Sequence, residues 1–216
     1  MLTRISKKYT PWLLILLLAF FAWLMLRITI EYIPVQTDVA FLQIKQDYID
    51  NNVWFTSFYI HVYTSMFALM AGFTQFSASI LRNNKALHRK IGYAYIIVVL
   101  FISGPASLVM SWYANGGLSS RVSFLMLGTL WIYFTARAWQ KAMKGEYKSH
   151  RAYMIRSYAL TLSAISLRAI KWLLASGFHL PPMEIYRTVA WTGWVLNLLV
   201  AEYFIINRLK SAPQLK

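Results

Sequence analysis

Cysteine is absent from the 216-residue sequence, and charge of either sign is scarce. Without cysteine, the protein cannot contain disulfides, thiolate metal sites or cysteine nucleophiles. Charged residues make up 13% of the chain, about half of what a soluble domain usually carries. Since 58% of the residues are hydrophobic, this deficit of charge indicates a membrane protein.

Two long stretches contain no charged residue, from Val53 to Leu81 and from Ile91 to Ser120. Each exceeds the roughly 20 residues that a helix needs to cross a bilayer. Residues 1–33 begin with a basic tail and continue as an apolar run, as a signal peptide would. No small-residue cleavage site follows this run, so we interpret it as an uncleaved first transmembrane helix.

The sequence predicts an all-α polytopic membrane protein, built as a six-transmembrane-helix bundle. The six apolar segments cover about residues 12–33, 53–76, 91–113, 122–142, 152–175 and 187–207. We divide the chain into four parts: an N-terminal basic tail with the first transmembrane helix (1–33), an extracytoplasmic polar link (34–52), a five-helix membrane core (53–207) and a basic cytoplasmic tail (208–216).

Lysine and arginine are distributed unevenly among the connecting segments. Fifteen of them lie in the two tails and in the second and fourth links, against three in the other three links. Under the positive-inside rule this predicts that both termini are cytoplasmic. The net charge of +15 therefore reports topology, and we do not expect nucleic acid as a partner.

Two predicted helices each carry a stripe of small and polar side chains along one face, because a helix turns about 100° per residue. Polar groups in hydrocarbon turn towards protein or water, so we expect both stripes to face the interior of the bundle. The stripe on the second helix comprises Ser57, His61, Ser65, Ala68, Gly72 and Gln75, and the stripe on the fifth comprises His150, Met154, Ser157, Thr161, Ala164 and Arg168.

The alternating directions of the helices place these residues by depth. His61 and Arg168 are expected to share a level in the outer leaflet. The sixth helix contributes Asn197 and Glu202, and Glu202 is the only acidic residue deep enough to compensate an inner arginine, so we predict that it pairs with Arg156. Five residues are expected near the cytoplasmic level: Gln75, His88, His150, Arg156 and Glu202.

Four blocks of sequence resemble a bacterial family of predicted membrane proteins, domain of unknown function 2306. They are HVYTSMFALMAGFTQF (61–76), LHRKIGYAY (87–95), SHRAYMIRSYALTLSAISLR (149–168) and WTGWVLNLLVAE (191–202). The resemblance covers about residues 53–205. It implies a bacterial cytoplasmic (inner) membrane and no particular activity. It does single out a set of polar residues: His61, Gln75, His88, Arg89, His150, Arg151, Arg156, Arg168, Asn197 and Glu202.

The leading hypothesis is a membrane redox protein that binds haem b or a quinone in this polar interior. Helical bundles supply axial histidines to haem, and arginines can hold its propionates. His88 and His150 lie at one depth and are the candidate iron ligands. Cationic residues on the fifth helix also suit the head group of a quinone or lipid. The expected partners are the lipid bilayer and a quinone, lipid or redox partner, and the candidate binding residues are His61, His88, His150, Arg156, Arg168, Gln75, Asn197 and Glu202.

Two alternatives remain open. A small transporter or proton-coupled permease would conduct along the stripe of the fifth helix, and Pro105, the only proline within a span, would suit a broken helix. A purely structural subunit would use His88, Arg89, His150 and Arg151 as interfacial anchors and Trp112, Trp131, Trp139 and Trp172 as belt residues. A hydrolytic metal site is not favoured, because no His-x-x-x-His spacing occurs.

Overall fold

The structure is a computed structural model that describes residues 16–209, apart from residues 18 and 179. The chain divides into two compact units, Met1–Gln46 and Asp47–Lys216. Within the described residues every regular element is helical, which confirms the predicted all-α class. Three stretches are long and apolar enough to cross a membrane: Lys85–Trp112, Tyr147–Phe178 and Pro182–Asn207.

The first unit contains an apolar helix, Ala19–Ile30, so the predicted span 12–33 lies partly outside the described residues. The polar link predicted at residues 34–52 contains two 3₁₀ helices, η1 (Ala40–Ile44) and η2 (Gln46–Tyr48). The amide of Gln46 donates to the carbonyls of Thr37 and Leu42 at 2.8 and 3.0 Å.

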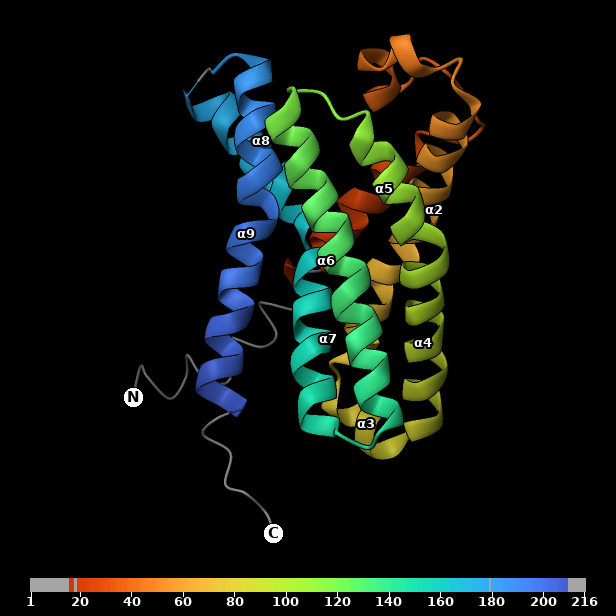
Figure 1. The fold of residues 1–216 in the computed structure, drawn as a ribbon, viewed down its shortest axis with the longest axis vertical. Coiled ribbons are helices and arrows are strands. Elements are labelled where there is room, and N and C mark those ends of the chain that lie inside the picture. The colour runs from red at the N-terminus through yellow and green to blue at the C-terminus, as the bar shows by residue number, and fades with distance from the viewer. Residues whose placement is uncertain (1–15, 18, 179, 210–216) are drawn as a thin grey trace. The chain divides into compact units, whose positions relative to one another are not determined.

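The second unit is a bundle in which α6 and α7 run side by side (Figure 1). Asn84 caps the start of α4 by accepting a hydrogen bond from the Leu87 amide at 2.9 Å, and α4 therefore begins six residues before the apolar segment predicted from hydropathy. The elements are α2 (Asn52–Gln75), α3 (Ala78–Asn83), α4 (Lys85–Ile97), η3 (Val98–Ser103), α5 (Gly104–Trp112), α6 (Leu118–Met143), α7 (Tyr147–Thr161), α8 (Ser163–Phe178) and α9 (Pro182–Leu209).

The element η3 is a π-helical turn that precedes Pro105. Proline has no backbone N–H and crowds the carbonyl four residues earlier, so a wider turn relieves the conflict. Here the Gly104 amide donates to the carbonyl of Val99, five residues back. A Cβ atom on Gly104 would lie 2.1 Å from that oxygen and 2.7 Å from Ile132. The result is a continuous helical stretch with a local bulge.

The predicted fifth helix is interrupted at Leu162, between α7 and α8. Just after the interruption, the hydroxyl of Ser163 donates to the Leu160 carbonyl at 2.5 Å, a local bond of the kind that competes with helical pairing. The 100° rule does not hold across such a break. Met154 at the near end of the predicted stripe is buried, whereas Arg168 beyond the break is exposed. The predicted stripe is therefore not continuous, because its part on α7 is buried and Arg168 on α8 is exposed.

The inward stripe of α2 allows α7 to approach closely. Ala68 is fully buried, and a Cβ atom on Gly72 would lie 1.8 Å from the ring of Tyr158. The Tyr158 hydroxyl donates to the Leu69 carbonyl at 2.9 Å. The prediction that this part of α2 faces the bundle interior is confirmed, and the missing side chain of Gly72 makes the space for the tyrosine.

Candidate functional site

The centre of the bundle holds a buried network of five side chains from α4, α6 and α7. The hydroxyl of Tyr95 lies 2.7 Å from that of Ser157 and 2.9 Å from that of Thr161. The indole of Trp131 donates to Thr161 at 2.9 Å, and the hydroxyls of Thr135 and Ser157 are 2.6 Å apart. Trp131 is 6% exposed, so its predicted role as a membrane-interface residue is wrong.

One assignment of the donors satisfies every hydroxyl in this network. In it Thr135 donates to the Trp131 carbonyl at 2.7 Å and accepts from Ser157 at 2.6 Å. Ser157 then accepts from Tyr95, and Tyr95 accepts from Thr161, which in turn accepts from the Trp131 indole. The chain of hydrogen bonds therefore begins and ends on Trp131. Every hydroxyl in it is satisfied, which favours a structural role over a reactive one.

His61 lies on α2 beside the π turn. Its Nδ1 atom is 3.0 Å from both the carbonyl and the hydroxyl of Ser103. A carbonyl can only accept, so Nδ1 carries the proton and Nε2 keeps its lone pair. The ring meets Trp131 edge-on at 6.4 Å. Arg168 lies within electrostatic range of His61 and donates to the Ala164 carbonyl at 2.9 Å.

Gln75, His88 and His150 come together at the end of the bundle where α6 joins α7. The Gln75 amide donates to the His88 carbonyl at 3.0 Å, and His88 lies within electrostatic range of His150. His150 donates from Nδ1 to the Ala138 carbonyl at 2.9 Å, which leaves Nε2 as its acceptor. Nδ1 of His88 is buried, with no hydrogen-bond partner among the described residues.

Arg156, Asn197 and Glu202 form ties between helices. Arg156 makes a two-point ion pair with Glu202, with Nη2 donating to Oε2 at 2.8 Å. The predicted Arg156–Glu202 pair is thus confirmed. Asn197 donates to the Ala159 carbonyl at 3.1 Å and accepts from Ser166 at 2.8 Å. These partners connect α9 to α7 and α8, so the three residues are engaged within the protein.

Arg137 and Tyr153 form a contact that sequence reasoning missed, because Arg137 was counted only as a marker of topology. Its guanidinium lies 5.8 Å from the centre of the Tyr153 ring. The signal was Gly145, whose φ of +73° marks the turn between α6 and α7. Residues at equal distances on either side of such a turn lie at a similar level of the helical hairpin, and Arg137 and Tyr153 both lie eight residues from it.

In the part of the chain that the structure describes, no three histidine, cysteine or carboxylate side chains gather into a metal-binding group. A haem iron needs only two axial ligands from the protein, so a pair of imidazoles is a sufficient donor set for it.

Comparison with known proteins gives one match. The family model described as "Predicted membrane protein (DUF2306)" matches residues 58–205. No curated protein and no solved structure matches the chain.

Proposed function

Because the chain belongs to the DUF2306 family of predicted membrane proteins, we propose that it is a multi-pass redox protein of the bacterial inner membrane that binds haem b. The three long apolar stretches support the membrane assignment. At 1.5 Å per residue, α2 and α6, with 24 and 26 residues, are also longer than the roughly 30 Å of a bilayer core. With the N-terminal apolar segment, this makes six spans, and the distribution of lysine and arginine favours cytoplasmic termini.

We propose His88 and His150 as the haem ligands, and the orientation of His150 carries the proposal. Its Nδ1–H is held by the Ala138 carbonyl, the arrangement that usually fixes a metal-binding imidazole and directs Nε2 at the metal. His88 comes from a different helix and lies within electrostatic range of His150. Bound haem would supply one-electron chemistry, and Arg89 and Arg151, next in sequence to the two ligands, suit its propionates.

A quinone is a second candidate ligand within the same redox function, at the level of His61 and Arg168. The free lone pair on Nε2 of His61 can accept from a quinol hydroxyl, and the Arg168 guanidinium can donate to a quinone oxygen. The measurement is the quinone that copurifies with the protein. It should fall in Arg168→Gln and not in Lys171→Gln, a control on the same helix.

Ligand binding is favoured over transport because the fifth-helix stripe is sealed. Met154, Ser157 and Thr161 are 8%, 0% and 7% exposed, and both hydroxyls belong to the closed ring of hydrogen bonds. A conducting path needs groups that open towards both sides of the membrane. In proteoliposomes we therefore expect no proton flux above that of empty vesicles.

The experiment for haem is a titration of the purified apoprotein with hemin. We expect one hemin per chain and a Soret band typical of two histidine ligands. His88→Ala and His150→Ala should each lose that band. His61→Ala and His179→Ala are matched controls and should keep it, although His179 lies outside the described residues. Unchanged binding in both ligand variants, or no binding by the wild type, would refute the assignment.

A further inference from the structure

A cluster of two arginines, Arg137 and Arg156, lies where α6, α7 and α9 meet. The Tyr153 ring is contacted by two guanidinium groups, Arg137 at 5.8 Å and Arg156 at 5.4 Å. Phe134 lies 5.9 Å from Arg156. Two cations at one aromatic ring concentrate positive charge, which the face of the ring only partly offsets.

The carboxylates near this cluster are already engaged. Both carboxylate oxygens of Glu202 accept hydrogen bonds from Arg156. Glu146 accepts from the Lys141 ammonium at 2.6 Å, and that hydrogen bond lowers the pKa of the carboxyl. Among the described residues Arg137 makes no ion pair, because Glu146, whose pKa its charge also lowers, is bonded to Lys141.

The hydrogen bonding of Arg137 is incomplete. Its Nη1 donates to Gln140 at 2.5 Å, but its Nε is buried and has no partner among the described residues. Buried N–H groups are almost always paired, and a guanidinium N–H requires an acceptor oxygen. This N–H therefore needs an acceptor oxygen beside Arg137, and an anionic oxygen would match the charge of the guanidinium.

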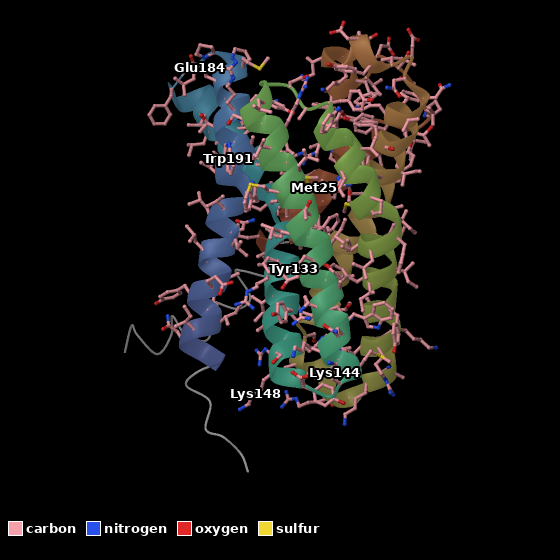
Figure 2. All side chains as sticks on the ribbon, viewed as in Figure 1. Met25, Tyr133, Lys144, Lys148, Glu184 and Trp191 are labelled. Carbon is pink, nitrogen blue, oxygen red and sulfur yellow. The ribbon has the colours of Figure 1, made fainter. Side chains whose placement is uncertain are left out.

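The position of the cluster along the bundle suits a lipid head group. Arg137 lies six residues before the end of α6, roughly 9 Å along the axis. Figure 2 shows Lys144 and Lys148 at this end of the bundle and Tyr133 farther towards its middle. Tyr133 is 48% exposed. Leu199, which lies about one turn before Glu202 on α9, is 59% exposed. Tyr133 and Leu199 thus offer exposed apolar surface on two of the helices that carry the cluster, as an acyl chain requires.

We propose that Arg137 and Arg156 bind the phosphate of an anionic phospholipid in the cytoplasmic leaflet. On α7, Tyr153 and Arg156 are turned by about 60° and 120° from His150. The lipid site is therefore separate from the proposed haem site and does not depend on it. Basic pockets between helices on the cytoplasmic side are the usual binding sites of such head groups.

The test measures lipid binding by native mass spectrometry of the full chain in detergent, with phosphatidylglycerol as the probe and phosphatidylcholine as the neutral comparison. The wild type should retain phosphatidylglycerol selectively. Arg137→Gln should weaken this binding about tenfold or more, the usual effect of losing a hydrogen bond to a charged group. Lys144→Gln removes the same charge from an exposed position and should weaken it less than about fivefold.

Two further arms complete the test. Arg137→Lys keeps the charge but loses the planar fork of donors, and it should bind between the wild type and Arg137→Gln; it also replaces the glutamine variant if that variant does not fold. Inorganic phosphate is titrated as the alternative source of the anion. Equal retention of phosphatidylglycerol by the wild type and the Arg137 variants overturns the proposal. Binding of inorganic phosphate that depends on Arg137, without retention of lipid, overturns the assignment to a lipid.

Discussion

Replacing Tyr95 by phenylalanine removes one hydroxyl from the buried ring of hydrogen bonds and keeps the aromatic ring in the core. The Trp131 indole would still donate to Thr161 at 2.9 Å. Thr161 would turn to its other acceptor, the Ser157 carbonyl at 3.2 Å. The Ser157 hydroxyl oxygen alone would lose its donor outright. One buried acceptor without a partner costs about 1–2 kcal/mol of unfolding free energy.

A loss of that size lowers the melting temperature of a chain of this length by about 2–8 °C. The assay is thermal unfolding in detergent, followed by circular dichroism. Tyr93→Phe is the matched control: Tyr93 lies on the same helix, is 49% exposed, and should melt with the wild type. The double variant with Ser157→Ala should cost less than the sum of the single changes by about 0.5 kcal/mol or more. If the free-energy costs of the two single changes were strictly additive, or if Tyr95→Phe left the melting temperature unchanged, the ring of hydrogen bonds would be refuted.

Two further predictions concern contacts between helices. Gly72→Ala places a methyl group 1.8 Å from a ring carbon of Tyr158 and should cost about 1–3 kcal/mol of unfolding free energy. Gly177→Ala, with nothing within 4 Å, is the control and should not lower the melting temperature. Glu202→Gln removes one member of a partly exposed ion pair and should cost about 1 kcal/mol; adding Arg156→Gln should recover part of that loss, and no recovery would contradict a direct interaction.

Sequence reasoning predicted a contact correctly where the residue types allowed only one arrangement. Glu202 is the only deep carboxylate on its helix, so Arg156 could be assigned as its partner before the structure was known. Gly72 and Ala68 recur at helical spacing, so their face could be assigned to a close helix contact. The first inference needed only the relative depth of two helices, and the second needed only the periodicity of one helix.

The rest depended on details that helical periodicity does not contain. No glycine or proline marks the interruption at Leu162, so the position of Arg168 was extrapolated across a break. Tryptophan is common at membrane interfaces, but the place of Trp131 in the core depends on hydroxyl partners from two other helices. The hairpin symmetry about Gly145 was readable in the sequence, and it would have paired Arg137 with Tyr153.

The reduced-minus-oxidised absorption spectrum of membranes from haem-replete cells tests the central claim most directly. Cells that produce the wild-type protein should show a b-type α-band well above that of cells with an empty vector. The extra absorption should be absent from membranes with the His88→Ala, His150→Ala double variant at equal protein level. An equal band in wild-type and double-variant membranes, or no band above the empty vector, would contradict haem binding between α4 and α7.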